Sequence, residues 1–266
     1  MPEGHIVHRQ AREITKLFGK NKVSVDSPQG RFTESASRIN GSTLTKATAQ
    51  GKHLFIHFDN QLAVHVHLGL YGKWSFLSEQ VDPVGLIRLR ITSDGACAEL
   101  RGPNACDVIT KGEMKSILAR IGPDPIKGDD PSRIRDKVLT SSAPIGALLM
   151  DQKLYAGVGN IYRAEVLFRH GINPFAQGAA MTEELFDSMW LDLTQLMKRG
   201  VRTGRIDTVR PEHEPRAMKR AAREDRHGGE VYVYRRSGQE CLVCGSIIEQ
   251  GELQGRNLFW CPRCQA

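Results

Sequence analysis

The chain has 266 residues, of which 40% are hydrophobic and 25% charged, a composition typical of a globular protein with one large or two ordinary domains. It contains no run of roughly 20 apolar residues that could cross a membrane, and its charged first 20 residues lack the apolar core of a secretory signal. We therefore expect a cytosolic protein with no membrane partner. The net charge of +7 favours a polyanionic partner, although a solvated basic face is the alternative explanation.

The first half of the chain carries one helical pattern followed by strand patterns. After the opening Met-Pro-Glu, residues 5–18 place apolar side chains at helical spacing, which predicts an amphipathic helix. Short segments rich in β-branched and aromatic residues then follow, separated by turn residues, at 52–59, 62–69, 71–77 and 84–91. These patterns predict an antiparallel sandwich up to about residue 115.

A connector and a helical region follow the sandwich. Residues 120–133 contain three prolines and two glycines, which indicates a domain boundary. Helical patterns occupy 131–139, 144–150, 157–170 and 182–199, the last opened by Thr182 as its cap. We expect three domains, at 1–115, 116–220 and 231–265.

Four cysteines near the end of the chain have metal-binding spacing. They form two Cys-x2-Cys pairs separated by 16 residues, at Cys241, Cys244, Cys261 and Cys264. In a cytosolic chain this spacing predicts one tetrahedral Zn²⁺ rather than two disulfides. Because sulfur fills all four positions, the zinc would be structural. No role follows for the other two, Cys97 and Cys106.

Two further segments suggest phosphate binding, each with an ordinary structural alternative. Asn160 follows a glycine-rich turn at the start of a helix, where backbone N–H groups and the helix dipole favour an anion. The same residues would also fit a simple helix cap and tight turn. Arg256, between the two cysteine pairs, could contact a phosphate through both guanidinium nitrogens or could be a solvated turn residue.

Taken together, Pro2-Glu3, the helix–turn–helix segment 148–174 and the ending GRNLFWCPRCQ resemble the formamidopyrimidine-DNA glycosylase and endonuclease VIII family. The resemblance covers residues 2–265, with the motifs in the expected order. It implies an α+β fold: an N-terminal helix and β-sandwich domain, then a helical domain with a helix-two-turns-helix motif and a zinc ribbon. It also implies a monomeric base-excision repair enzyme whose partner is damaged DNA, in a bacterial cytosol and associated with the nucleoid when bound to DNA.

The resemblance assigns catalytic roles to four residues. Once Met1 is removed, the secondary amine of Pro2 would attack C1′ of the sugar, since an α-amino group titrates near 8 and is partly neutral at neutral pH. Glu3 is suited to proton transfer with the opened sugar oxygen. Lys52 matches a lysine that assists base loss or elimination, although alone it would be interpreted as a solvated strand-edge residue. Arg256 would bind the phosphates beside the lesion and take part in the second elimination.

Four residues are expected to contact DNA. Leu70 and Tyr71 would enter the base stack when the damaged base is extruded; core packing or chance exposure is the alternative. Arg120 matches an arginine of the connector that contacts DNA, and Asn160 would complete the phosphate clamp.

The chain departs from the family pattern in two places. Ile6 stands where many relatives have a second Glu. The stretch LRGPNACDV lacks the phenylalanine of the purine-specific branch, where Arg101 could replace only part of that function.

The subtype and the activity itself each have alternatives. Gly4, the Leu-Tyr pair and the short run before the ribbon favour the endonuclease VIII branch and oxidised pyrimidines, whereas His-Leu-Gly before Leu70 is more similar to the purine branch. An oxidised-purine glycosylase is therefore the first alternative. A non-catalytic zinc-ribbon DNA-binding protein is the second, and an RNA-binding or scaffold zinc protein is the third.

Overall fold

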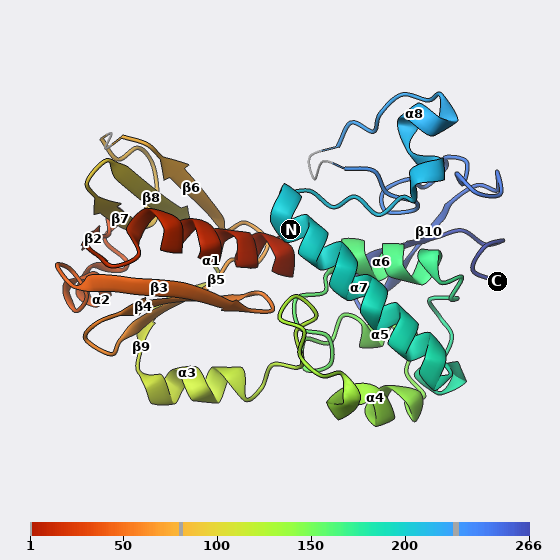
Figure 1. Cartoon of the computed structure of the whole chain (residues 1–266), viewed down its shortest axis with the longest axis horizontal. Coiled ribbons are helices and arrows are strands. Elements are labelled where there is room, and N and C mark those ends of the chain that lie inside the picture. The colour runs from red at the N-terminus through yellow and green to blue at the C-terminus, as the bar shows by residue number, and fades with distance from the viewer. Residues whose placement is uncertain (1, 80–81, 226–228) are drawn as a thin grey trace. The chain divides into compact units, whose positions relative to one another are not determined.

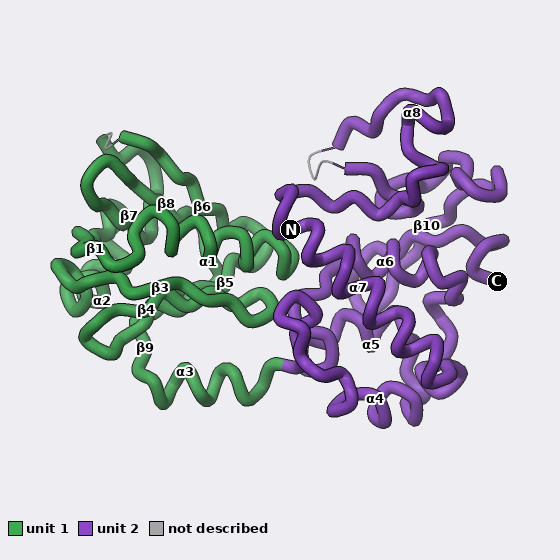
Figure 2. Tube along the Cα trace, viewed as in Figure 1, with its two compact units in different colours: residues 1–121 green, residues 122–266 purple. Residues whose placement is uncertain are grey.

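The computed structural model describes residues 2–79, 82–225 and 229–266. Figure 2 shows two compact units, residues 1–121 and residues 122–266, and each is described by itself below. Met1, on whose removal the chemistry of Pro2 depends, lies outside the described residues. The finer division into three domains remains a proposal.

The first unit is a two-sheet sandwich with helix α1 (Gly4–Phe18) at its start (Figure 1). One antiparallel sheet has five strands, in the order β1 (Asn21–Lys22), β3 (Thr43–Gln50), β4 (His53–Phe58), β5 (Ala63–His67) and β9 (Ala105–Ile109). The other has four, in the order β2 (Ser24–Asp26), β7 (Ile87–Ser93), β8 (Ala96–Arg101) and β6 (Lys73–Leu77). The unit also holds two short helices, α2 (Thr33–Ser37) and α3 (Lys111–Leu118).

Strand alternation explains why the sandwich has a filled interior. Leu54 and Ile56 of β4 belong to a buried core that also includes residues of α1 and of the second sheet. Phe55 points to the opposite face of β4, where Met114 and Ile117 of α3 pack against it. The predicted sandwich and opening helix are therefore confirmed, whereas the prediction missed α2 and α3.

Helix α1 runs antiparallel to β3. Near its end the amide of Lys20 donates to the Leu44 carbonyl at 2.7 Å. One turn of helix earlier, the Thr15 hydroxyl accepts from the Ala47 amide at 2.8 Å. Moving back along the helix therefore means moving forward along β3, so that α1 begins at the same end as the β3–β4 turn, as Figure 1 shows.

The second unit combines helices with a terminal hairpin. Its helices are α4 (Ser132–Leu139), α5 (Ile145–Leu148), α6 (Asn160–Arg169), α7 (Glu183–Thr203) and α8 (Pro215–Met218), with 3-10 turns at η1 (Gly178–Ala180) and η2 (Pro211–His213). The hairpin pairs β10 (Glu249–Leu253) with β11 (Arg256–Trp260). In the described part of the chain, no helix is both long and apolar enough to cross a bilayer.

The sequence correctly predicted where the helices of the second unit lie, but it predicted their first and last residues less accurately. Thr182 caps α7 as predicted, by accepting from the Leu185 amide at 3.2 Å. The helix continues to Thr203 and ends at Gly204, whose φ of 76° is readily adopted by glycine. The pattern at 157–170 becomes a helix only from Asn160, because the residues before it form the turn.

The hairpin and the helices share one hydrophobic core. Tyr232 stacks on Phe168 of α6 with ring centroids 4.5 Å apart. Tyr234 meets Phe259 of β11 edge to face at 5.4 Å. Phe259 therefore links β11 to the segment 232–234, and Tyr232 of that segment packs on α6.

A buried carboxylate completes this attachment. Glu165 of α6 is fully buried and accepts hydrogen bonds from the backbone N–H groups of Tyr232, Val233 and Tyr234 at 2.6–2.9 Å. It also accepts from the Thr208 hydroxyl at 2.5 Å. Four donors compensate the desolvation of this charge, so Glu165 fixes the segment that leads into the ribbon.

Replacing Glu165 should destabilise the second unit strongly. Glu165→Ala leaves four buried donors without their acceptor, and each such loss costs about 1–3 kcal/mol. We expect the free energy of unfolding in urea to fall by about 3 kcal/mol or more, with a marked loss of folded protein. Glu183→Gln, a change at an exposed position of α7, is the control and should alter the free energy by less than about 0.5 kcal/mol. Equal, small effects of the two changes would contradict the structural role of Glu165.

Candidate active site and metal centre

The two N-terminal candidates lie at the start of α1. Pro2 is half-buried, and Glu3 is only 1% exposed although it carries a carboxylate. Glu3 occupies the cap position of α1, yet its side chain makes no capping hydrogen bond to the helix. A side-chain cap therefore does not explain why a carboxylate is buried at this position.

The path of α1 along β3 brings Lys52 to the same end of the sandwich. From Thr15 back to Gly4 the helix covers 11 residues, or about 17 Å at 1.5 Å per residue. From Ala47 forward to Gln50, the last residue of β3, the strand covers 3 residues, or about 10 Å at 3.3 Å per residue, and Gly51 and Lys52 then form the turn to β4. Because Thr15 and Ala47 are hydrogen-bonded, the start of α1 lies alongside the turn that carries Lys52 (Figure 1).

Beside Lys52, the outer face of the five-stranded sheet carries a group of histidines. His53 is hydrogen-bonded to His65 at 2.9 Å and packs against His67 with ring centroids 4.9 Å apart. The pKa of His53 is lowered to about 3, chiefly by burial and in addition by the nearby His67, His65, Arg120 and Lys52. The histidines are thus neutral at pH 7, and they add no positive charge next to Lys52 and Arg120.

The predicted wedge residues lie where the sequence put them, in the connection between β5 and β6. Leu70 and Tyr71 are both exposed. Gly69 has a φ of 65°, and a Cβ at this position would lie 2.8 Å from Cβ of Asn104. The connection is therefore closely packed against the loop after β8, and the two apolar side chains point outward from a fixed backbone.

Arg101, which the sequence suggested as a partial substitute for the base-contacting residues of the purine branch, is already engaged within the first unit. Its guanidinium donates to the buried carboxylate of Glu99 at 2.7 Å and to the carbonyl of Val84 at 3.0 Å. Pairing with an orphaned base would leave Glu99 in the interior with a weaker partner. The structure therefore corrects this interpretation: Arg101 anchors a loop.

In the second unit, the turn before α6 is tied directly to the hairpin. The side-chain amide of Asn160 donates to the carbonyl of Asn257 at 2.8 Å. Arg163, fully buried one turn later, donates to the same carbonyl at 3.0 Å and to the Asn160 side chain. Arg256, the exposed first residue of β11, directly precedes Asn257. The predicted phosphate ligands Asn160 and Arg256 are thus brought together.

Sequence reasoning missed Arg163 and Asn257. The signal for Arg163 was its position three residues after Asn160 in an otherwise apolar helix, since a charged residue on a buried face requires polar partners. Asn257 contributes a backbone carbonyl, for which a sequence carries no signal.

The four C-terminal cysteines are arranged to bind one metal ion. Their sulfur atoms all lie within 4.8 Å of one another, with Cys241 and Cys264 3.9 Å apart and Cys244 and Cys261 3.4 Å apart. Tetrahedral Zn²⁺ with bonds of about 2.3 Å requires sulfurs about 3.8 Å apart. The geometry fits one structural zinc, which the protein binds through these four thiolates.

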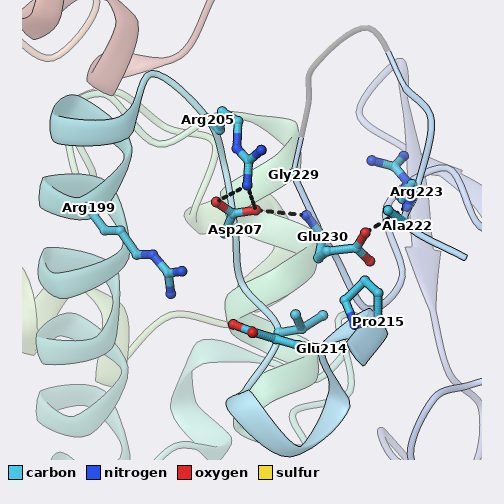
Figure 3. Close-up of a pocket in the computed structure, with 10 residues that line it drawn as sticks. Arg199, Arg205, Asp207, Glu214, Pro215, Ala222, Arg223, Gly229 and Glu230 are labelled. Carbon is cyan, nitrogen blue, oxygen red and sulfur yellow. Dashed lines mark hydrogen bonds and ion pairs between the residues drawn. The ribbon is translucent and has the colours of Figure 1, made fainter. Parts of the chain in front are cut away.

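Figure 3 shows a charged pocket of about 370 Å³ in the second unit, between α7 and the segments around Pro215 and Glu230. Arg205 pairs with Asp207 at 3.1 Å. Asp207 and Glu230 also accept backbone hydrogen bonds, Glu230 from the amide of Arg223 at 2.7 Å. These charges compensate one another, so the pocket lacks the uniform charge of an anion site.

The basic stretch between Lys198 and Arg236 is therefore only partly a candidate DNA surface. It contains 12 Lys and Arg against 6 Asp and Glu. Three of its arginines, however, form ion pairs within the stretch: Arg205 with Asp207 at 3.1 Å, Arg220 with Glu230 at 2.7 Å and Arg223 with Asp225 at 2.8 Å. These arginines hold the segment together rather than extending toward a partner.

Comparison with known proteins settles the family. Residues 1–104 match the formamidopyrimidine-DNA glycosylase N-terminal domain, residues 121–211 match the formamidopyrimidine-DNA glycosylase H2TH domain, and residues 238–266 match the zinc finger found in FPG and IleRS. The chain belongs to the formamidopyrimidine-DNA glycosylase and endonuclease VIII family. Within it, the chain is 48% identical to endonuclease 8 1 of Mycobacterium bovis and 26% identical to endonuclease 8 of Klebsiella pneumoniae, over the full length of each protein. The predicted leaning to the endonuclease VIII branch is confirmed.

Solved structures confirm the fold. The Lactococcus lactis Fpg in complex with DNA containing an abasic site superposes with a TM-score of 0.81 at 21% identity, covering 99% of both chains. A complex of the same protein with DNA containing an oxidised pyrimidine gives 0.82 at 22% identity, again over 99% of both. At these identities the likeness concerns the fold alone.

Zinc content provides a direct test of the cysteine cluster. Elemental analysis of purified protein should find about one zinc per chain, and Cys261→Ser should reduce the zinc content several-fold because a neutral hydroxyl replaces a thiolate. Cys106→Ser, outside the cluster, should leave the zinc content unchanged. Retention of a full equivalent by Cys261→Ser would refute the four-thiolate site.

The neutral state of His53 predicts acid sensitivity. Its pKa of about 3 in the folded protein lies below the ordinary value of about 6.5 in the unfolded chain. Between these values the unfolded state binds more protons, so stability is lost as the pH falls. At pH 5 the loss relative to pH 7 should be about 2 kcal/mol from this group. Urea unfolding of wild type and His53→Gln at both pH values should show a smaller loss in the variant; parallel losses would exclude His53 as the cause.

Proposed function

We propose that the protein is a bifunctional DNA glycosylase and abasic-site lyase of base-excision repair that removes oxidised bases, with pyrimidines favoured. The observation that carries the proposal is the position of Pro2 and Glu3, at the start of a helix that lies alongside the turn with Lys52, in a chain of this family. In this proposal it acts as a monomer on damaged DNA in the bacterial cytosol, and it associates with the nucleoid when bound to DNA.

Pro2 supplies the nucleophile. After removal of Met1, its neutral secondary amine attacks C1′, the bond from C1′ to the damaged base breaks, and the base leaves with the bonding electrons. The Pro2 nitrogen then gives up its proton, which balances the proton that the leaving base takes up. Glu3 donates a proton to the sugar ring oxygen as the ring opens, which gives an iminium between Pro2 and C1′. A general base then removes a proton from C2′. The iminium accepts the electrons of the broken C–H bond, and the 3′ phosphate is expelled. A second elimination expels the 5′ phosphate.

Lys52 and the second-unit residues assist these steps. Lys52, a half-buried cation, stabilises negative charge that develops as the base or the phosphate leaves. Asn160 and Arg256 bind the phosphates beside the lesion, a role supported by their link through the Asn257 carbonyl. Arg256 also takes part in the second elimination.

Three residues act on the duplex. Leu70 and Tyr71 fill the gap left by the extruded base, which agrees with their exposure on a constrained loop. Arg120 is exposed at the end of the first unit and contacts the DNA backbone.

The preference for pyrimidines is supported by the 48% identity to a protein named endonuclease 8 1. The absence of a phenylalanine after Arg101 and the engagement of Arg101 with Glu99 also argue against the purine branch. His-Leu-Gly before Leu70 favours the alternative, an oxidised-purine glycosylase. A non-catalytic DNA-binding protein is less well supported, because Pro2, Glu3 and Lys52 are all present.

Reductive trapping tests the proposal. Incubation with borohydride and a duplex containing 5-hydroxyuracil should yield a covalent protein–DNA adduct at Pro2, located by peptide mass spectrometry, and the adduct should form faster than with 8-oxoguanine. An uncleaved N-terminal extension should abolish the adduct, because an acylated proline nitrogen is not nucleophilic. Glu3→Gln should slow base removal about 100-fold or more. The proposal fails if no adduct forms with either lesion or with a plain abasic site.

A further inference from the structure

Four large apolar side chains are exposed at one end of the four-stranded sheet. Leu70 and Tyr71, in the connection between β5 and β6, are 59% and 86% exposed. Val84 and Leu86, in the connection between β6 and β7, are 76% and 71% exposed. Filling the gap left by an extruded base explains the exposure of Leu70 and Tyr71, but it does not explain the exposure of Val84 and Leu86.

Strand register places the two pairs at the same sheet end. Arg101, the last residue of β8, is opposite Lys73, the first residue of β6, on one side. On its other side it is opposite Ile87, the first residue of β7. Leu70 and Tyr71 immediately precede β6, and Val84 and Leu86 immediately precede β7, so both connections enter the sheet beside the end of β8.

The second connection is held in a defined position. The guanidinium of Arg101 joins the Val84 carbonyl at 3.0 Å to the buried Glu99 carboxylate at 2.7 Å. Gly85 has a φ of 80°, and its carbonyl accepts from the amide of Ile87 at 3.1 Å. A tight turn anchored to the sheet therefore presents Val84 and Leu86 to the solvent, so little conformational freedom remains to be lost on binding.

We propose that this loop, Pro83–Leu86, is a second apolar contact of the protein with duplex DNA, beside the contact made by Leu70 and Tyr71. The proposal rests on the proposed function. Val84 and Leu86 pack against the sugar and base edges next to the gap, and so stabilise the distorted duplex from which the base is extruded.

Charge supports a groove contact rather than a backbone contact. The connection carries Glu79 and Asp82 before its tip, and these carboxylates would be repelled by phosphates. The tip itself is uncharged, and the exposed cation of Lys73 lies at the adjacent strand end. The surface that meets DNA is therefore the apolar tip, which suits the edges of sugars and bases.

The test compares two double variants of the full chain. In Val84→Ser/Leu86→Ser, single-turnover excision from a 5-hydroxyuracil duplex should fall about tenfold or more, and the fluorescence rise of a 2-aminopurine next to the lesion should be reduced. Borohydride trapping on a single-stranded abasic oligonucleotide, which has no duplex to distort, should be unchanged. Leu191→Ser/Met218→Ser, which removes apolar side chains that are 57% and 37% exposed in the second unit, should match wild type in all three assays.

The outcomes separate this inference from the proposed function. If the wild type forms no adduct on single-stranded abasic DNA, the proposed function fails. If it does, and the Val84/Leu86 variant matches wild type on the duplex, only this inference is overturned. Loss of self-association by that variant in sedimentation, with normal duplex excision, would assign the loop to contact with a second copy and would also overturn it. Unchanged melting temperatures of both variants would show that the fold is intact.

Discussion

The buried carboxylate of Glu165 determines how the second unit is assembled. Four hydrogen bonds from the backbone of residues 232–234 and from Thr208 satisfy it. The same helix, α6, carries Asn160 and Arg163, which both donate to the carbonyl of Asn257. One ten-residue helix thus holds the ribbon at two places, before the first cysteine pair and on the outgoing strand of the hairpin. These contacts fix the backbone of Asn257, the residue that directly follows Arg256.

A comparable constraint acts in the first unit, but it comes from packing geometry. The hydrogen bond between Thr15 and Ala47 fixes the register of α1 on β3, and the helix length then determines where its first residues lie. A helix one turn shorter would start about 5 Å farther back along β3. The length of α1 therefore decides whether its first residues lie at the end of the sandwich that carries Lys52. Neither the helical pattern of α1 nor the strand pattern of β3 shows this relation by itself.

The sequence predicted elements whose signals are local. The spacing of four cysteines indicated the zinc site, the apolar period indicated α1, and Thr182 indicated the start of α7. The contact of Asn160 with Asn257 could not be predicted, because it joins residues 97 positions apart through a backbone carbonyl. The anchoring of Arg101 could not be predicted either: in the sequence it is an arginine in a loop, and only the fold brings it to Glu99 and Val84. The sandwich was recognisable, but α3 was missed because its apolar contacts are few and lie on the outer face.

The zinc and the buried charges of α6 stabilise the same small element in complementary ways. A two-stranded hairpin is marginally stable at best in water, and β10 and β11 have only five residues each. The metal closes the base of the hairpin through four thiolates, whereas Asn160 and Arg163 hold the beginning of β11, at the opposite end from Cys261. With zinc alone, the tip of the hairpin would remain free to twist; with the α6 contacts alone, its base would open. Both constraints are needed to orient Arg256, so any contact of this arginine with phosphate depends on zinc loading and on the integrity of α6 at the same time.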